Sequence, residues 1–265
     1  MADLAKRWSI QGKTALVTGG TRGIGKAVAD ELLGLGASVY VCGRSEETLA
    51  AVLKTWKEAG HNVGGSAADV SSREAREELM KKVHSFFKGK LDILVNNAGA
   101  NIRKPTVEYT AEDMSFLMST NFESAYHLNQ LAHPLLKASG NSSIVFVSSV
   151  AGVTAIRSGT LYAASKAAMN QIAKNLACEW AKDGIRVNSV APWYTKTDMV
   201  EQIFKEKFFL DDVVQRTPMR RIGTGQEVAA VVAFLCLPAA AYVTGQVVSV
   251  DGGFTANGFY PLTDV

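Results

Sequence analysis

The chain has 265 residues, of which 47% are hydrophobic and 20% charged, and its formal net charge is +3. This globular composition fits one large α/β domain or two small ones, and its interleaved acidic and basic residues argue against a nucleic-acid partner. No apolar run reaches membrane-spanning length, and the N-terminal segment MADLAKRWSIQGK lacks the apolar core of a signal peptide. We therefore expect a cytoplasmic protein with neither a membrane nor a nucleic-acid partner.

Short apolar segments alternate with longer helical patterns along the whole chain. The predicted strands are 14–19, 38–43, 62–70, 91–99, 143–149, 185–192 and 245–253. Several are apolar at consecutive positions, which is typical of parallel strands covered on both faces. Helical patterns such as GKAVADELLGLG and REAREELMKKVHSFF lie between them. The alternation predicts a Rossmann-like α/β fold, a doubly wound parallel sheet of about seven strands with helices on both faces.

The segment from 195 to about 218 departs from this alternation. It is long and by turns charged and apolar, as in DMVEQIFKEKFFLDDVVQRTP. We predict a helical insertion that covers a substrate site. Because no linker rich in Pro, Gly or Ser divides the chain, we expect a single domain over 1–265.

The cysteines and histidines predict no metal site. Cys42, Cys178 and Cys236 are far apart and form no CxxC pair, so we expect small buried hydrophobic residues rather than ligands or disulfides. The four histidines show no ligand spacing either, and packing or surface roles explain them better.

A glycine-rich sequence, VTGGTRGIGKAV, joins the first predicted strand to the first helix. Gly19, Gly23 and Gly25 would allow a tight turn and a close approach of backbone N–H groups to a pyrophosphate at the helix N-terminus. A glycine-rich turn alone is weak evidence, because a plain loop can look the same. The preceding strand and the following helix favour a dinucleotide site.

Two arginines bear on which dinucleotide binds. The second strand ends in Gly43 and Arg44, without the acidic residue that would hold the ribose 2′-OH of NAD. Arg22 lies within the glycine loop. Two guanidinium groups suit the 2′-phosphate of NADP(H), since arginine makes paired, charge-assisted bonds to phosphate. The alternative is that either arginine is simply solvated.

Further motifs follow in order. NNAG occupies 96–99, SSVAG occupies 148–152, and the pair Tyr162-x-x-x-Lys166 begins thirteen positions after Ser149. Tyrosine and lysine four residues apart share a helix face, which alone says nothing about chemistry. Together with the glycine loop, Asn121 and VDGG (250–253), these motifs make the chain resemble the short-chain dehydrogenase/reductase family over nearly its whole length. LACEWAKDGIRVNSVAP and DGGFTANG are similar to its tropinone-reductase-like group, whose members differ in substrate.

The resemblance implies an NADP(H)-dependent enzyme that reversibly reduces a ketone to a secondary alcohol. Asn121, Ser149, Tyr162 and Lys166 would form the catalytic tetrad. Tyr162 would donate the proton, and the Lys166 ammonium would lower the pKa of that phenol and bind the nicotinamide ribose. Ser149 would hold the substrate oxygen, and Asn121 would carry the helix kink and the proton relay. Neighbouring strand residues face opposite ways, so only one of Ser148 and Ser149 should reach the site, and the spacing selects Ser149.

The resemblance also implies a set of cofactor contacts along the glycine loop and the strand ends. These are Gly19, Thr21, Arg22, Gly23, Ile24, Gly25, Arg44, Asp69, Val70, Asn96, Ala98, Gly99, Tyr162, Lys166, Pro192, Thr195 and Thr197. Asp69 could equally be an ordinary acid at a strand end. Trp193 stands where many family members have glycine, and tryptophan lacks glycine's conformational freedom, which puts Tyr194 and Thr197 in doubt.

The expected substrate pocket has a mostly apolar rim, which suggests a small lipophilic or cyclic ketone. Its candidate residues are Val150, Ile156, Trp193, Tyr194, Met199 and Phe204. Within the family, the alternatives are a 3-oxoacyl reductase or a sugar or steroid dehydrogenase. An alternative of another class is a non-catalytic, cofactor-sensing scaffold. The family also implies a homodimer or homotetramer, assembled through helices around 113–138 and 161–181.

Overall fold

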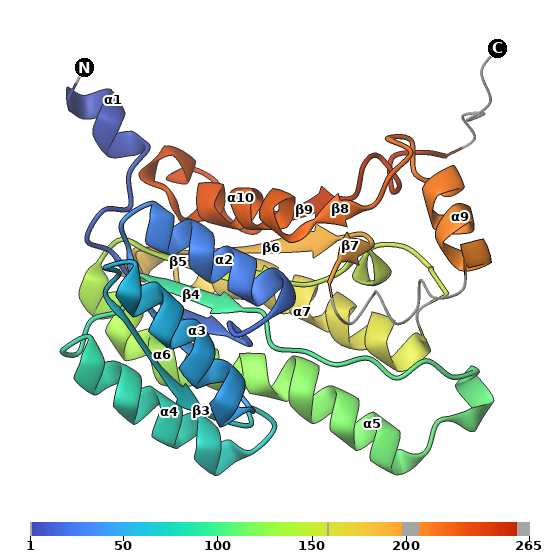
Figure 1. Cartoon of the computed structure of the whole chain (residues 1–265), viewed down its shortest axis with the longest axis horizontal. Helices are drawn as coiled ribbons and strands as arrows, with labels where there is room; N and C mark the ends of the chain where they lie inside the picture. The colour runs from blue at the N-terminus through green and yellow to red at the C-terminus, as the bar shows by residue number, and fades with distance from the viewer. Residues whose placement is uncertain (1, 158, 198–206, 259–265) are drawn as a thin grey trace.

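The parallel strands form one sheet, shown in Figure 1 in a computed structural model that describes residues 2–157, 159–197 and 207–258. The strand order is β3-β2-β1-β4-β5-β6-β9, and every pairing is parallel. The strands are β1 (Thr14–Thr18), β2 (Ser38–Gly43), β3 (Val63–Ala67), β4 (Ile93–Asn96), β5 (Ser142–Val147), β6 (Ile185–Pro192) and β9 (Val247–Val250). The predicted fold class is confirmed. The order reverses between β1 and β4, where α/β sheets of this kind bind ligands.

Helices cover both faces of the sheet (Figure 1). The described helices are α1 (Ala2–Arg7), α2 (Gly23–Gly34), α3 (Glu46–Glu58), α4 (Arg73–Phe86), α5 (Ala111–Met118), α6 (Ser124–Ser139), α7 (Thr160–Glu179), α9 (Lys207–Arg216) and α10 (Gly225–Cys236). The core residues of α2, α3 and α10 pack on one face, and those of α4, α6 and α7 pack on the other.

The consecutive apolar residues of the strands explain this double cover. In β1, the Val17 side chain packs toward α2 and α10, whereas that of Leu16 packs toward α4 and α6. Val41 and Tyr40 divide in the same way in β2. Side chains alternate along a strand, so only an uninterrupted apolar run supplies both cores.

Short polar side chains begin several helices where the strand–helix loops end. Ser45 accepts a hydrogen bond from the Thr48 N–H at the start of α3, and Ser72 does the same for Ala75 at the start of α4. Thr110 forms a capping box at α5. Such caps satisfy N–H groups that the first turn leaves unpaired, so helix starts follow closely from sequence.

The helix predicted around 113–138 is interrupted. A π-helix, Ser119–Glu123, separates α5 from α6 and contains Asn121. This turn carries the kink that the family resemblance implied. Single π-helical turns inside α-helices occur often at functional sites.

The described part of the predicted insertion contains elements of two kinds. α9 is helical as predicted, whereas β7 (Thr195–Lys196) pairs in parallel with β8 (Gly223–Thr224), which the sequence did not predict. This small sheet ties the end of the β6 loop to the start of α10. Residues 198–206, including Met199 and Phe204, lie outside the described residues.

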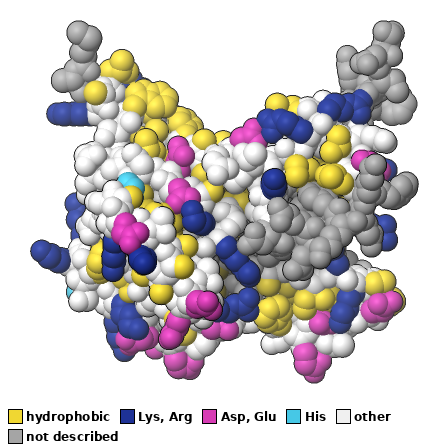
Figure 2. Space-filling model, in the orientation of Figure 1, with side chains coloured by type: hydrophobic (Ala, Val, Ile, Leu, Met, Phe, Trp, Pro, Cys, Tyr) yellow, Lys and Arg dark blue, Asp and Glu magenta, His cyan; other side chains and the backbone are white. Residues whose placement is uncertain are grey.

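Surface charge, cysteine burial and helix length can each be compared with the expectations from sequence. Positive and negative side chains are interspersed over the face in Figure 2. Cys42 and Cys236 are buried as expected, but the expectation for Cys178 was wrong, because this residue is exposed on α7. None of the described helices is long and apolar enough to cross a membrane.

Candidate functional site

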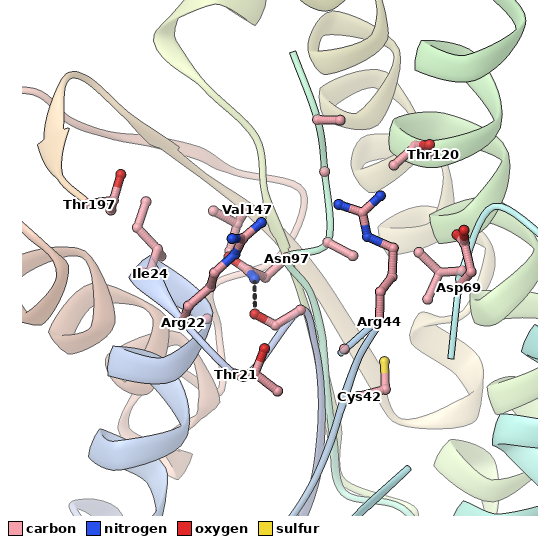
Figure 3. Close-up of a pocket in the computed structure, with 18 of the residues that line it drawn as sticks. Thr21, Arg22, Ile24, Cys42, Arg44, Asp69, Asn97, Thr120, Val147 and Thr197 are labelled. Carbon is pink, nitrogen blue, oxygen red and sulfur yellow. Dashed lines mark hydrogen bonds between the residues drawn. The ribbon is translucent and has the colours of Figure 1, made fainter. Parts of the chain in front are cut away.

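A cavity of about 570 Å³ opens at the carboxyl ends of the central strands, where the sheet order reverses. Figure 3 shows it between the start of α2 and the segments that follow β2, β3 and β4. The expected cofactor residues on its wall are Gly19, Thr21, Arg22, Gly23, Ile24, Gly25, Arg44, Asp69, Val70, Ala98, Gly99, Tyr162, Lys166 and Thr197.

The glycine loop forms one wall of the cavity because side chains would not fit there. Gly19 and Gly23 have φ values of 63° and 55°, which L-residues with a Cβ rarely adopt. A Cβ at Gly25 would collide with the carbonyl oxygen of Gly19. α2 begins at Gly23 without a side-chain cap, so its first N–H groups remain available to an anion. This cradle fits a pyrophosphate.

Two guanidinium groups and one carboxylate lie beside this cradle. Figure 3 shows Arg22 and Arg44 projecting in the same direction from neighbouring loops, with Asp69 close to Arg44. Burial acts to raise the pKa of Asp69, but two hydrogen bonds from Ser71 and the charge of Arg44 outweigh it and lower the pKa below its ordinary value. The cavity therefore offers two cations and an ionised acid near one end.

Three expected cofactor residues do not line the cavity. The Asn96 side chain is buried and donates to Oδ1 of Asn129 at 3.3 Å. The cavity side chain comes instead from Asn97, whose Nδ2 donates to the carbonyls of Thr18 and Gly19. Pro192 and Thr195 are likewise buried outside the wall. Side-chain direction within NNAG depends on how β4 ends, which the motif does not reveal.

Other residues line the wall although the sequence analysis did not place them among the cofactor contacts. These are Cys42, Gly43, Ser45, Thr48, Ala68, Asn97, Ala100, Thr120, Val147 and Ser148. Most of them lie one or two positions from a motif residue. They could have been predicted by including the sequence neighbours of each motif residue at the strand ends.

Two of the four tetrad residues, Tyr162 and Lys166, line the cavity, whereas Ser149 and Asn121 lie behind its wall and contact residues that line it. The Lys166 Nζ donates to the Val147 carbonyl at 2.9 Å and lies 5.7 Å from the centre of the Tyr162 ring. Ser149 and Tyr162 share a hydrogen bond. Asn121 Oδ1 accepts from the Ala100 N–H at 2.8 Å.

Asn121 is held from both ends of its amide. Besides accepting from Ala100, it donates from Nδ2 to the Ala100 carbonyl at 2.9 Å and to Ser165 Oγ at 3.1 Å. Its side chain is fully buried. The π-helix thus fixes this amide between the NNAG loop and α7, the helix that carries Tyr162 and Lys166.

The expected influence of Lys166 on Tyr162 needs correction. Burial raises the pKa of Tyr162, and the groups that oppose this rise are the Ser149 hydroxyl and the charge of Arg103. Burial also lowers the pKa of Lys166 itself to about 8, because the ammonium is desolvated. Its Nζ points to the Val147 carbonyl rather than to the phenol oxygen.

Ser148 and Ser149 follow β5 rather than lying within it, and their hydroxyl groups have different partners; Ser148, and not Ser149, lines the cavity. Ser149 faces Tyr162 and also accepts from the Ala151 N–H at 3.1 Å. Ser148 Oγ donates to the Lys166 carbonyl at 3.1 Å, although this residue also touches the cavity wall. The structure therefore puts the Ser149 hydroxyl, and not that of Ser148, beside the phenol.

Comparisons with known proteins agree with this geometry. Residues 19–255 match a family model described as Enoyl-(Acyl carrier protein) reductase, one of the short-chain dehydrogenase models. A tropinone reductase homolog of Arabidopsis thaliana is 60% identical over 254 residues, covering 96% of each chain. The chain belongs to the short-chain dehydrogenase/reductase family.

Solved structures of the family are similar over nearly the whole chain. A gluconate 5-dehydrogenase from Burkholderia cenocepacia, in complex with NADP and tartrate, is 30% identical with a TM-score of 0.91, covering 96% of this chain and 100% of that one. A 7α-hydroxysteroid dehydrogenase, in complex with NADH and 7-oxo glycochenodeoxycholic acid, is 33% identical with a TM-score of 0.89, covering 94% and 96%. The protein is therefore an oxidoreductase of this family, and the expected nicotinamide cofactor is confirmed.

Trp193 directly follows β6, which ends at Pro192. Its backbone does not adopt positive φ, so the glycine common in relatives is not required here. Its ring stacks on Phe254 with centroids 3.8 Å apart, and its Nε1 donates to Thr217 Oγ1 at 3.0 Å. Trp193 thereby joins the end of β6 to the segments after α9 and β9.

Arg103 is a residue that the sequence analysis missed. It lies on the exposed loop after β4, hydrogen-bonds Tyr194, and acts electrostatically on both Tyr194 and Tyr162. Burial raises the pKa of Tyr194 despite this contact. A cation therefore stands beside the proton donor. No sequence motif includes Arg103, because its contact with Tyr194 depends on how the loop after β4 packs.

The remaining substrate candidates are only partly supported by their positions. Tyr194 is buried against Trp193 and Phe209, Ile156 is half-buried, and Val150 is fully buried in the turn after Ser149. Val150 therefore presents no surface to a ligand. Among the described residues, no group of three or more His, Cys, Asp or Glu side chains could hold a metal ion.

Proposed function

We propose that the protein reduces a ketone to a secondary alcohol with NADPH, and catalyses the reverse oxidation with NADP⁺. The observation that carries this proposal is that Tyr162 and Lys166 line the same cavity as Arg22 and Arg44, with the Ser149 hydroxyl hydrogen-bonded to Tyr162. The non-catalytic alternative is disfavoured because the tetrad is complete.

The cofactor, when bound, supplies the hydride. The glycine cradle and the start of α2 would hold its pyrophosphate. Asp69 and Val70 would contact the adenosine side, and Lys166 and Thr197 the nicotinamide side. These residues position the reacting carbon, which is the protein's main contribution in a cofactor enzyme.

Tyr162 would then provide the proton that the developing alkoxide needs. The Ser149 hydroxyl is hydrogen-bonded to the Tyr162 phenol. A substrate oxygen bound by Ser149 would therefore lie within reach of the phenol. As Tyr162 gives up its proton, the charge of Arg103 and the hydrogen bond from Ser149 would stabilise the phenolate. Asn121 orders the Ala100 and Ser165 groups beside this path.

The preference for NADP(H) rests on Arg22 and Arg44. No acidic residue ends β2, and both guanidinium groups project in the same direction from neighbouring loops (Figure 3). Arginine binds phosphate in a paired, charge-assisted geometry, which favours the 2′-phosphate over a bare ribose.

Arg103 bears on the substrate class. A ketone that carries a tertiary amine, such as tropinone, is a cation at neutral pH and would be repelled beside this guanidinium. Trp193 and Tyr194 add aromatic surface near the same place. We therefore infer a small cyclic or lipophilic ketone that is neutral or anionic, covered by the segment about 195–218.

NADPH oxidation with a panel of ketones tests this proposal. The arms are a neutral cyclic ketone, tropinone, a keto acid, a 3-oxoacyl thioester, a keto sugar and a keto steroid. We expect turnover of the neutral cyclic or the anionic small ketone, and an increase for tropinone when Arg103 is changed to Gln. No turnover in any arm contradicts the enzyme proposal, whereas a wild-type preference for tropinone contradicts only the charge argument.

A homodimer or homotetramer is proposed for the assembly, through α5–α6 and α7. Met114, Phe116 and Tyr126 are exposed apolar side chains on this face, and Figure 2 shows hydrophobic residues gathered over α5. Exposed patches of this kind favour association. Light scattering after size-exclusion chromatography tests the assembly: a monomer at working concentration contradicts it.

We propose the cytoplasm as the location. The support is that Cys42, Cys178 and Cys236 are all free, as is usual for proteins of a reducing compartment. A fluorescent fusion at the C-terminus tests it, and accumulation in an organelle contradicts it.

A further inference from the structure

Arg76 is a fully buried arginine that neither lines the cavity nor belongs to the tetrad. It lies on α4, with a side-chain exposure of 0%. Arginine is rarely buried unless it is paired, since an unpaired buried cation is costly. Its partners therefore indicate what this position does.

Two of its bonds reach the adenosine side of the cavity. Nη1 donates to the carbonyl of Val70 at 2.9 Å and to that of Ser71 at 3.3 Å. Val70 and Asp69 line the cavity, and Ser71 holds the Asp69 carboxylate. Arg76 thus fixes the loop after β3 by its backbone.

Its other two bonds reach the π-helix and α6. Nη2 donates to Glu123 Oε1 at 2.6 Å, and Nε donates to His127 Nδ1 at 3.0 Å. Glu123 is the last residue of the π-helix, which also carries Asn121 and the cavity residue Thr120. The same guanidinium therefore holds the element that positions Asn121.

We propose that Arg76 is a positioning residue that couples the adenosine loop to the π-helix of Asn121. Occupation of the adenosine end then restrains the loop Asp69–Ser71, and the guanidinium passes that restraint to Ser119–Glu123. This inference rests on the family's nicotinamide chemistry and not on the identity of the ketone.

Only arginine has the donor geometry for this role. Its planar fork presents five N–H donors in fixed directions, whereas lysine is a point charge on a flexible stem. His127 accepts through Nδ1, so its proton is on Nε2 and its ring is neutral, and burial lowers its pKa accordingly. Arg76→Lys could keep the charge but not all four bonds.

Hydrogen exchange of the π-helix amides tests the coupling without any turnover. The probe is 2′,5′-ADP, with 5′-AMP in parallel, each at saturation. Each fragment that binds should slow amide exchange at Ser119–Glu123 in the wild type. In Glu123→Gln and Arg76→Met, the bound fragment should leave the exchange rate of these amides unchanged. Glu123 is 55% exposed, so its change to Gln should leave the fold intact.

The controls are exposed residues of the same helix. Arg73→Met removes an exposed arginine that forms an ion pair with Glu77, and Glu78→Gln removes a surface carboxylate. Both should behave like the wild type. Equal protection in Glu123→Gln and the wild type would overturn the proposal.

Steady-state kinetics give a second readout that a purely structural role would not move. Glu123→Gln should lower kcat about tenfold, the loss expected for one charge-assisted bond, while KM for the cofactor stays within about twofold. Arg76→Lys should change both constants, because it loosens both ends. If Arg76→Met does not fold, Glu123→Gln still decides: a change in KM alone, or in neither constant, contradicts the coupling. Binding of 5′-AMP but not 2′,5′-ADP would refute only the NADP(H) proposal.

Discussion

The two ends of the site are built in different ways. At the cofactor end, the Gly19–Gly25 loop and the strand ends form the wall largely with backbone, and Gly25 has no room for a side chain. The proposed substrate end depends instead on side chains from distant segments: Trp193 after β6 stacks on Phe254 after β9, and Arg103 after β4 contacts Tyr194. A backbone site tolerates few residue types, whereas a side-chain site changes with each substitution.

This difference explains why the protein's reaction class is easier to infer than its substrate. The cofactor end repeats a geometry that any dinucleotide requires. The substrate end depends on which side chains three loops bring together.

The largest effect is expected for Tyr162→Phe, which removes the proton donor that both ends serve. Turnover should fall by about 10³-fold, within the usual range for a general acid. Cofactor affinity, measured by NADPH fluorescence, should change less than about twofold, because the glycine cradle is untouched. Tyr126→Phe, which removes an exposed phenol on α6, is the control. Turnover near the wild-type level in Tyr162→Phe would refute the mechanism.

Arg44→Asp tests the cofactor end alone. We expect the KM for NADPH to rise about a hundredfold, since charge-assisted bonds are lost and a like charge faces the 2′-phosphate. The KM for NADH should stay equal or fall. Arg73→Asp, outside the cavity, should change neither. Parallel increases for both cofactors would count against the 2′-phosphate assignment.

Lys166 predicts a pH dependence of cofactor binding. Burial lowers its pKa to about 8, so the ammonium predominates below that pH and the neutral amine above it. If the ammonium binds the ribose, the Kd for NADPH should rise about tenfold between pH 7 and pH 9. Cys42, also on the wall, has a pKa raised by burial to about 11 and stays protonated over this range. A flat profile in the wild type, like that expected for Lys166→Met, would refute the assignment.

Trp193→Phe should have the smallest effect and concerns the substrate end. The ring can still stack on Phe254, but the bond from Nε1 to Thr217 is lost. We expect a loss of about 1 kcal/mol and a Tm about 2–4 °C lower in calorimetry. Trp8→Phe, at the exposed end of α1, should leave Tm unchanged. A changed KM for NADPH with an unchanged Tm would contradict this prediction, because it would show that Trp193 acts on the cofactor end of the site.

The fold was largely predictable because its signals are local. Strands β2 and β6 begin and end where the apolar runs do, since a strand buried on both faces must be apolar throughout. The predicted strands 62–70 and 91–99 were too long, because β3 ends at Ala67 and β4 ends at Asn96. Asp69 and Asn97 follow the strands in loops whose direction is set by contacts with Ser71 and Thr18. Those contacts join or turn segments in ways that no periodicity records.

From the sequence alone came the glycine cradle, the tetrad and the two arginines, because each depends on residue types at fixed short spacings. The tertiary structure decided which side chain of NNAG faces the cavity, that burial rather than Lys166 dominates the pKa of Tyr162, and that Arg103 stands beside it. It also joined Arg76 to Glu123 across 47 positions. Burial and long-range charge depend on how helices and loops pack together, and a linear spacing contains no record of that packing.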